Sequence, residues 1–381
     1  MRNMTDSQDN RSRRPEDNLY NRRSPAYDHN FNALLPFFGF NPDDKLFAGF
    51  SGTYTRYGFR KSPYASQHRY GTLVSLSTGG VKAYYEGNWS NVIGRLGLQF
   101  ATELQTPLYA SNFYGLGNES VNSEEELGLD YNRLRERRVE AGLKLAWRPN
   151  DQFQVLFGPR FSSIRVDNTA GRFIETVADQ FPAEIFDGIE MLSLEAGLQF
   201  NNVDQLSFPT RGLRFSLDAG WTDQIDEEDF NFPFLESELA LYQQLDGRGK
   251  LVLATQLGIQ TRFSNDFPFF LGATLGGLGP DGNLRGFRRD RFTGRTALYH
   301  NTDLRWKAFY WNNNAIPMSV GFSASFDYGK VSIDNVESDT IHYSYGAGIF
   351  FAPFDLLTIH VGGYLGDGED LRWLIGGAFF F

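Results

Sequence analysis

Residues 279–292, GPDGNLRGFRRDRF, are the stretch of this sequence best suited to charge chemistry. The stretch holds four arginines and three glycines and shows no apolar periodicity. A guanidinium presents a planar fork of donors that can pair carboxylates in a bidentate way. Gly282 and Gly286 flank Arg285 and allow the backbone to turn sharply. The pattern predicts a loop whose arginine binds acidic groups elsewhere in the chain.

The expected partners of Arg285 are two carboxylates on neighbouring strands. Alternation of apolar and polar residues places Asp303 on the polar face of one predicted strand and Asp327 on the polar face of the next. A loop folded inward would bring Arg285 against Asp327, with Asp303 nearby. The alternative is a solvated basic loop and two unrelated polar residues.

Sixteen stretches of the chain alternate apolar and polar residues with a period of two, the mark of a strand with one apolar and one wet face. Many of them run for about 11–15 residues, whereas an average strand of a soluble protein has ~5–6 residues. The greater length fits a strand that crosses a membrane, with ~9–11 residues inside the lipid and ends that project from it. An even number lets the sheet close without an edge in lipid. The expected strands are 29–39, 44–57, 67–78, 80–90, 92–105, 130–147, 151–166, 187–201, 211–223, 232–246, 249–263, 295–309, 314–328, 339–352, 355–364 and 371–381.

The connections between these stretches are mostly short after even-numbered strands and often long after odd-numbered ones, as in outer-membrane barrels. The predicted fold is therefore all-β: a sixteen-stranded antiparallel transmembrane β-barrel with a long loop folded into the lumen. Residues 29–381 are expected to form the barrel. Residues 1–28 are polar and charged, contain no apolar signal-peptide core, and are expected to be disordered.

Composition narrows the classes of function. The formal net charge is −10, which gives no basic surface for nucleic acid, and the absence of Cys excludes disulfides and Cys-based metal sites. The five histidines lack metal-ligand spacing. The acidic runs 123–126 and 226–229 are expected to be solvated loop charge rather than cation sites. A barrel lipase would need a Ser/His pair that faces outward, and the sequence does not suggest such a pair. We expect no catalytic residue, metal or cofactor.

The last predicted strand, 371–381, carries apolar residues at alternate positions, among them Trp373, Phe379 and the final Phe381. This pattern resembles the C-terminal signal by which an assembly machinery recognises bacterial outer-membrane proteins. Gly376 and Gly377 are expected to weaken this strand. The edge could then open and template a client strand by β-augmentation. Close packing or a bend would also explain the two glycines.

Three motifs carry a resemblance to a known family. Leu284, Arg285, Gly286 and Phe287 match a loop signature [VL]RG[FY], residues 326–329 (FDYG) resemble the family's F-x-D-x-G motif, and Pro209, Thr210 and Gly212 match a P-T-x-G turn. In these motifs and their order the sequence resembles the BamA/TamA superfamily, also called the bacterial surface antigen family. The first half is also similar to barrels fused to surface metallophosphoesterase-like proteins. The family's POTRA repeats and a signal peptide are not found, so we expect a fragment or a misassigned start.

The resemblance implies a site and a function. It implies that the loop enters the lumen, where Arg285 pairs with Asp327 and Asp303 is a second partner. It implies a non-enzymatic protein of the bacterial outer membrane that inserts proteins into that membrane or moves them across it. The implied partners are outer-membrane lipid and unfolded outer-membrane or secreted proteins. The alternative is a membrane anchor or secretion pore for a separate metallophosphoesterase- or patatin-like domain, and a passive porin is a third class.

Overall fold

The computed structural model describes residues 31–376, apart from short breaks, and also Phe379 and Phe381. The predicted disordered segment 1–28, the acidic run 226–229 and Gly377 lie outside the described residues. The breaks fall at 42, 44, 59–60, 110, 206, 226–229, 279–281, 313–315, 335–336 and 355–357.

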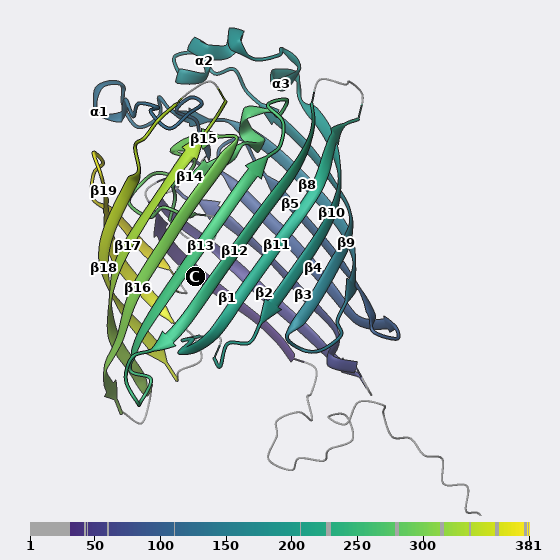
Figure 1. Cartoon of the computed structure of the whole chain (residues 1–381), viewed down its shortest axis with the longest axis vertical. Coiled ribbons are helices and arrows are strands. Elements are labelled where there is room, and N and C mark those ends of the chain that lie inside the picture. The colour runs from purple at the N-terminus through teal and green to yellow at the C-terminus, as the bar shows by residue number, and fades with distance from the viewer. Residues whose placement is uncertain are drawn as a thin grey trace, which may run out of the picture.

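Sixteen antiparallel strands close into one barrel, which confirms the predicted fold class and strand number (Figure 1). Each predicted stretch corresponds to one strand of the barrel; the stretch 130–147 also includes the short strand Arg133–Leu134, and the stretch 92–105 begins within the strand Val81–Ile93. In their order around the barrel the strands are β1 (Phe31–Asn41), β2 (Lys45–Gly58), β3 (Lys61–Ser75), β4 (Val81–Ile93), β5 (Leu96–Gln105), β8 (Glu136–Trp147), β9 (Phe153–Val166), β10 (Ile189–Asn201), β11 (Arg211–Gln224), β12 (Asn231–Gln244), β13 (Leu251–Arg262), β16 (Thr296–Trp311), β17 (Met318–Ser332), β18 (His342–Pro353), β19 (Ile359–Gly366) and β20 (Arg372–Gly376).

The long loops at one end contain short elements that strand alternation does not predict. Two small two-stranded sheets form there, and helices α2 and α3 lie over the loop end of the barrel (Figure 1). These elements are β6 (Ser111–Asn112), α1 (Glu124–Leu127), β7 (Arg133–Leu134), α2 (Phe173–Val177), η2 (Ala178–Gln180), α3 (Glu184–Asp187), η3 (Phe269–Leu271), β14 (Ala273–Leu275) and β15 (Phe292–Gly294). Buried side chains including Ile174, Ile185, Phe232 and Phe269 pack into an apolar cap beneath them. No helix in the described part of the chain has the length and apolar character needed to cross a membrane.

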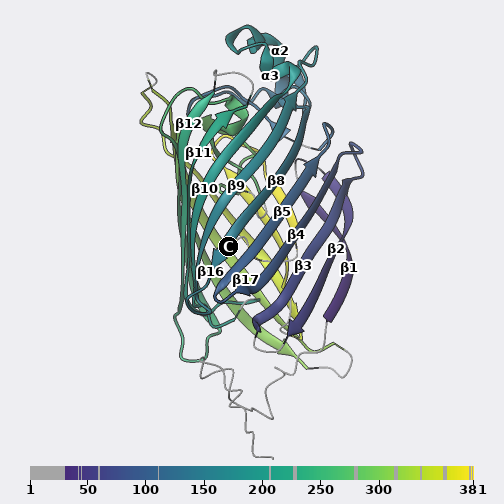
Figure 2. The same ribbon diagram turned by 90° about the vertical axis from the view of Figure 1, so that its right-hand side faces the viewer.

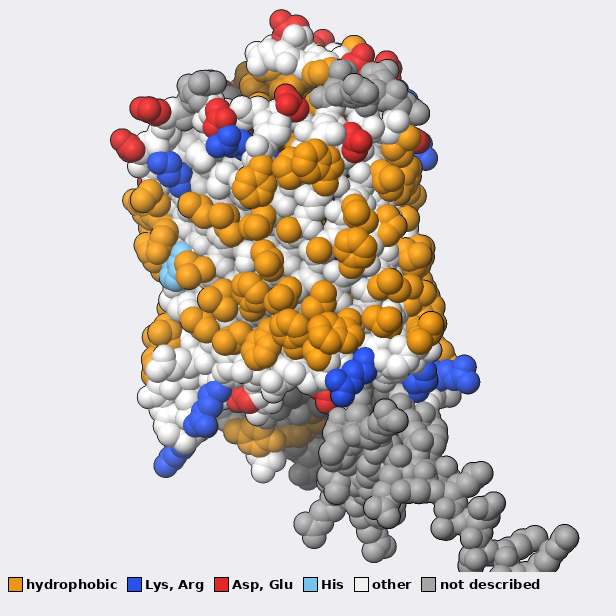
Figure 3. Space-filling model, turned by 45° about the vertical axis from the view of Figure 1, so that its right-hand side comes forward, with side chains coloured by type: hydrophobic (Ala, Val, Ile, Leu, Met, Phe, Trp, Pro, Cys, Tyr) orange, Lys and Arg blue, Asp and Glu red, His pale blue; other side chains and the backbone are white. Residues whose placement is uncertain are grey.

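The outer surface of the barrel carries an apolar belt. On β10, Leu192 and Leu194 are exposed while Ser193 and Glu195 are buried, so alternate residues face outward and inward. Apolar side chains cover the middle of the wall in Figure 3, with charged side chains of both signs toward the loop end and mainly basic ones toward the turn end. An apolar belt with a polar interior is what a bilayer requires of a β-barrel.

The seam between the first and last strands is the thinnest junction of the sheet. β1 pairs with β2 through eleven residue pairs, from Phe31↔Thr55 to Asn41↔Lys45. Among the described residues it pairs with β20 through Phe40↔Ile375 alone. The last strand was predicted to run over 371–381, but it ends at Gly376. Strands β1 to β4 also end lower toward the loop end than β8 to β12 (Figure 2).

Neighbouring residues on β5 provide a test of the belt. Phe100 packs against Tyr85 on the outer face, whereas Ala101 pairs with Glu86 on the inner face. We expect Phe100→Arg to lower the free energy of unfolding in lipid vesicles by about 2–4 kcal/mol, because it places a charge in the apolar region. Ala101→Arg, beside Glu86, should change it by less than about 1 kcal/mol. Urea titration monitored by gel mobility would measure both, and equal losses would contradict the assignment of the faces.

Candidate functional site

The loop between β13 and β16 enters the lumen and is fixed there by buried apolar residues. Leu284 and Phe287 pack with Leu275, Tyr299 and Val331 in one cluster. Gly286 lies directly against the β19 backbone: a Cβ added to it would come within 2.4 Å of the Gly366 nitrogen and 2.5 Å of the Ser344 Cβ. A residue larger than Gly at position 286 would therefore push the loop away from the wall.

Arg285 joins two carboxylates that project from adjacent strands. Its Nε and Nη2 donate to the two oxygens of Asp327 at 2.8 and 2.5 Å, and its Nη1 donates to Asp303 at 2.7 Å. The side chains of Arg285 and Asp327 are each 1% exposed, and that of Asp303 is 2% exposed. Ser344 and Ser325 donate to Asp327 and Asp303 at 3.2 and 2.9 Å. The structure thus brings together the three residues singled out in the sequence. Each of the two carboxylates accepts hydrogen bonds from Arg285 and from a serine.

A second buried arginine belongs to this site and was missed from the sequence. Arg305 on β16 donates through Nε and Nη2 to the free oxygen of Asp303, at 3.1 and 2.8 Å. Asp303 therefore lies between two guanidinium groups. The sequence signal was available, because Arg305 follows Asp303 by two residues on the same face of the strand.

The other arginines of the loop bind residues on both sides of the seam. Arg288 donates to Glu124 at 2.6 Å and lies 3.5 Å from Asp43, which is in the β1–β2 turn. Arg291 donates to Glu369, in the β19–β20 turn, at 2.7 Å. Since these two turns flank the seam, the loop connects its two sides. We call the two ion pairs, Arg288–Asp43 and Arg291–Glu369, the clasp.

The P-T-x-G motif forms the turn before β11. The Thr210 hydroxyl and amide donate to Asp204 at 2.5 and 2.9 Å. Gly212 has a φ of +109°, and a Cβ there would lie 2.7 Å from the Asn202 oxygen, so the turn requires Gly. Pro209 is buried and follows Phe208, which packs in the lumen against Val252 and Phe350. The turn therefore fixes an aromatic side chain inside the barrel.

The residues of the predicted C-terminal signal separate onto two faces. Trp373 is exposed on the outer wall, whereas Phe379 packs in the lumen with Phe208 and Phe350, and Phe381 packs near Tyr242. Trp373, Phe379 and Phe381 therefore do not share the one apolar face that alternation predicts for this segment. Among the described residues, a Cβ at Gly376 would meet nothing closer than 3.9 Å, so close packing against them does not explain this glycine. Recognition of this segment by an assembly machinery stays a prediction.

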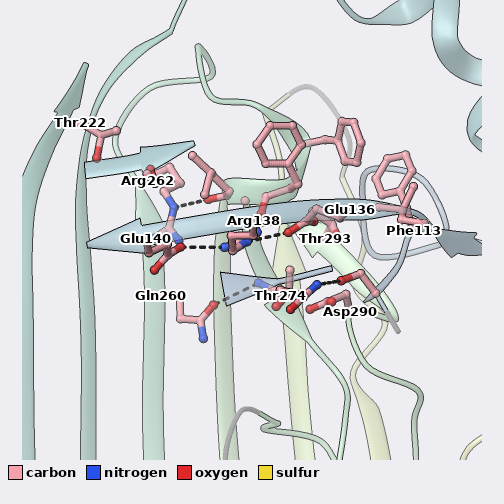
Figure 4. A pocket seen from close by; sticks show the side chains of 18 of the residues that line it. Phe113, Glu136, Arg138, Glu140, Thr222, Gln260, Arg262, Thr274, Asp290 and Thr293 are labelled. Atoms are coloured by element: carbon pink, nitrogen blue, oxygen red, sulfur yellow. Dashed lines mark hydrogen bonds and ion pairs between the residues drawn. The ribbon is translucent and has the colours of Figure 1, made fainter. Parts of the chain in front are cut away.

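The opposite wall of the lumen carries an array of mixed charges beside a cavity of about 380 Å³ (Figure 4). Arg138 pairs with Glu136 at 2.6 Å and with Glu140 at 3.2 Å. Asp290, from the loop, also lines the cavity, and its φ of +53° is unusual for a residue other than Gly. Burial, together with the nearby charge of Glu136, raises the pKa of Asp290 to about 6, against the opposing effects of Arg289, Thr274 and Arg138.

The described residues contain no cluster of three or more His, Cys, Asp or Glu that could hold a metal ion. Glu124 of the acidic run 123–126 is engaged by Arg288. Two Ser/His contacts exist among the described residues. Ser323 and His360 lie 2.9 Å apart, are buried and face the lumen. Ser66 and His68 lie 3.2 Å apart on β3, where His68 packs against Tyr85 on the outer face. It is the tail residue Phe379 that packs against His360.

Loss of the Arg285 side chain should release the loop. Arg285→Ala leaves Asp303 and Asp327 buried without their shared partner, and breaking a buried pair in this way costs about 3–5 kcal/mol. Arg285→Lys should fall between wild type and Ala, because an ammonium lacks the fork that reaches both acids. The control is Arg295→Ala, which removes the partly exposed pair with Asp334 and should cost about 1 kcal/mol or less. Urea unfolding and proteolysis of the loop would measure these effects, and equal losses at 285 and 295 would contradict this prediction.

Docking of the loop should weaken as pH rises. The pKa of Asp290 in the folded protein, about 6, lies above the value of about 3.9 for a free Asp. The docked loop therefore binds more protons, and its stability falls as pH increases from about 4 through about 6. Asp290→Asn should remove this part of the pH dependence. Hydrogen exchange of the loop amides between about pH 4 and about pH 7 would test it, and an unchanged profile in the variant would contradict it.

Comparisons with known proteins agree with the architecture. Residues 104–353 match the model of the Omp85 superfamily domain. No curated protein matches the sequence. Among solved structures, the chain is similar to BamA from Haemophilus ducreyi lacking POTRA domains 1–3, with 14% identity and a TM-score of 0.63 over 92% of this chain and 70% of that one.

Two further structures share the fold. CdiB from Escherichia coli has 11% identity and a TM-score of 0.57, covering 90% of this chain and 62% of that one. CdiB from Acinetobacter baumannii has 12% identity and a TM-score of 0.53, covering 91% and 59%. This chain thus spans about three fifths of the two CdiB chains. With the family model matched over most of the barrel, the chain belongs to the Omp85 superfamily and is an outer-membrane β-barrel of that type.

Proposed function

We propose that this barrel opens between β1 and β20 and thereby inserts polypeptides into the outer membrane or moves them across it, without catalytic chemistry. One observation carries the proposal: the seam has a single residue pair, Phe40↔Ile375, among the described residues. The likeness to BamA and CdiB barrels supports it at the level of the fold.

Opening of the seam would expose the edge of β1, to which an incoming chain could bind. Backbone donors and acceptors without a partner cost several kcal/mol each in lipid, so a strand edge at the seam favours any chain that can pair with it. An incoming segment would add to this edge by β-augmentation. Leu34, Leu35 and Phe38 are exposed on β1, which leaves apolar side chains beside the edge for the segment to contact.

The loop controls the opening in this proposal. The clasp holds the β1–β2 turn through Asp43 and the β19–β20 turn through Glu369, so the two sides of the seam can separate only when at least one clasp pair breaks. Arg285 keeps the loop seated while this happens, because its own partners lie on β16 and β17, away from the seam. In this proposal Arg285 and its partners Asp303 and Asp327 anchor the loop, and the clasp is the part that moves.

A reversible lock tests the proposal. The sequence contains no Cys, so Phe40→Cys with Ile375→Cys introduces the only thiols, and oxidation joins the seam. We expect the oxidised barrel in liposomes to insert a urea-unfolded eight-stranded outer-membrane barrel no faster than empty liposomes do, and reduction to restore the rate. Protease protection of an unfolded passenger inside the vesicles gives the corresponding measurement for translocation.

The matched control keeps Ile375→Cys and pairs it with Val361→Cys on β19, which locks a junction that need not open. This variant should insert the unfolded barrel at the same rate in its oxidised and reduced forms. If the seam lock leaves both insertion and translocation unchanged, the opening mechanism is wrong, and the role of membrane anchor for a separate enzymatic domain becomes the better explanation.

A further inference from the structure

Five arginines lie at the loop end of the wall formed by β8 and β9, below the loop that carries α2 and α3 (Figure 2). We call them the arginine cluster; its members are Arg133, Arg135, Arg137, Arg165 and Arg172. The five strands β1 to β5 separate β8 from the seam. The proposed opening of the barrel therefore makes no use of these residues.

Two members of the cluster face outward from the barrel wall. Arg137 pairs across the ladder with Arg165, and both are exposed. The neighbouring Glu136 lines the lumen cavity, and Val166 packs in the apolar cap. Like charges directly opposite each other on adjacent strands destabilise a sheet. An anion between the two side chains would offset their repulsion.

The other three members gather at the end of the same ladder. Arg135 extends the pairing of β8 with β9 by one step, because its carbonyl accepts from the Asp167 amide at 2.9 Å. Arg172 Nη1 donates to the Arg133 carbonyl at 2.9 Å. Burial, and then the positive charge of Arg135, lowers the pKa of Arg172; Asp130 opposes this shift and Arg133 adds to it. The arginines therefore lie close enough to repel one another.

The carboxylates beside the cluster do not neutralise it. Asp130 lies 2.9 Å from Arg133 Nη1, and Asp167 lies 3.8 Å from Arg165 Nε. The side chains of these two acids are 70% and 44% exposed, so solvent screens their charges. Within the part of the chain that the structure describes, the other three members take part in no ion pair.

Two of the guanidinium groups also hold unused donors. The Nε atoms of Arg133 and Arg135 are buried and donate to no group among the described residues. A buried donor without an acceptor costs free energy, which an added acceptor would recover. Phosphate oxygens suit this place, because guanidinium groups pair with them through parallel hydrogen bonds.

The wall below the cluster is apolar and faces the lipid. Leu143 and Leu145 on β8 and Phe157 on β9 are exposed on it. Long loops mark the outer side of an outer-membrane barrel, so the cluster lies at the level of the outer-leaflet headgroups. A ligand that meets both surfaces has an anionic head and apolar chains.

We propose that the arginine cluster binds the phosphate-bearing headgroup of a lipid in the outer leaflet, while the acyl chains of that lipid lie along the apolar wall of β8 and β9. The phosphate would lie among Arg135, Arg137 and Arg172, the members without an acidic partner. An acidic segment of another protein is the competing occupant, and it would leave the apolar wall unused. This inference is independent of the proposed function.

The test uses the full chain folded in detergent micelles and two lipid probes, a bisphosphorylated lipid A and the same lipid after removal of its phosphates. Native mass spectrometry measures the amount of each lipid bound over a range of concentrations. We expect the phosphorylated lipid to bind at least about tenfold more tightly. Tenfold corresponds to about 1.4 kcal/mol, and one hydrogen bond to a charged group contributes at least that much.

A pair of matched variants locates the site. Arg135→Gln with Arg172→Gln should weaken binding of the phosphorylated lipid at least about tenfold and leave binding of the dephosphorylated lipid unchanged. The control, Arg211→Gln with Arg248→Gln, removes two exposed arginines at the turn end and should bind as the unmodified chain does. Gel mobility with and without heating verifies that each barrel is folded.

Urea unfolding gives a second measurement. The phosphorylated lipid should raise the unfolding midpoint of the unmodified chain, because it binds the folded state, and should leave that of the cluster variant unchanged. Without lipid, the cluster variant should be at least as stable as the unmodified chain, because it has lost repulsion between like charges.

Equal binding of the two lipids would overturn the proposal, and so would an equal loss of affinity in the turn-end control. If inorganic phosphate raises the midpoint as much as the lipid does at the same concentration, the site binds free phosphate and the assignment of a lipid is wrong. If a polyglutamate peptide raises it more than the lipid does, the cluster is a site for an acidic protein segment instead.

Discussion

The interior of this barrel depends on the neutralisation of two buried carboxylates. Asp303 and Asp327 project into the lumen from adjacent strands and are almost fully removed from solvent. Buried charges of like sign are tolerated only when a cation with suitable geometry lies between them. Arg285 meets that need from the loop and Arg305 from the wall, so the path of the loop, the position of the tail and the closure of the seam all depend on this one electrostatic requirement.

The lumen is divided by this arrangement into two unlike halves. One half, along β16 to β19, is filled by the loop and by an aromatic cluster of Phe208, Phe350 and Phe379. The other, along β5 to β12, contains two cavities: Arg138 and Glu140 pair beside one, and Lys144 and Glu195 pair beside the other. The apolar cap includes Ile174 of α2 and Ile185 of α3 and lies at the loop end of the barrel.

The sequence predicts the features of this structure that depend on local patterns, and it does not predict those that depend on contacts between distant residues. Alternation with a period of two located the sixteen strands and the inward faces of Asp303 and Asp327, because each strand of a barrel repeats the same local rule. The same rule failed after Gly376, since a Phe suits lipid and an aromatic lumen site equally well and alternation cannot distinguish them. The clasp was not predicted: Arg288 and Asp43 are 245 residues apart, and their loops carry no periodic signal.

These separations in sequence imply an order of assembly. Arg285 lies 18 residues from Asp303 and 42 from Asp327, so the hairpin of β16 and β17 can recruit its arginine with a small loss of chain entropy before the barrel exists. The Arg288–Asp43 contact joins the β13–β16 loop to the turn of the first hairpin, so it can form only when these distant parts of the barrel have come together. Contacts of such long range form late in folding. The clasp is therefore the last part of the loop to be made and the first that can be undone without unfolding the wall.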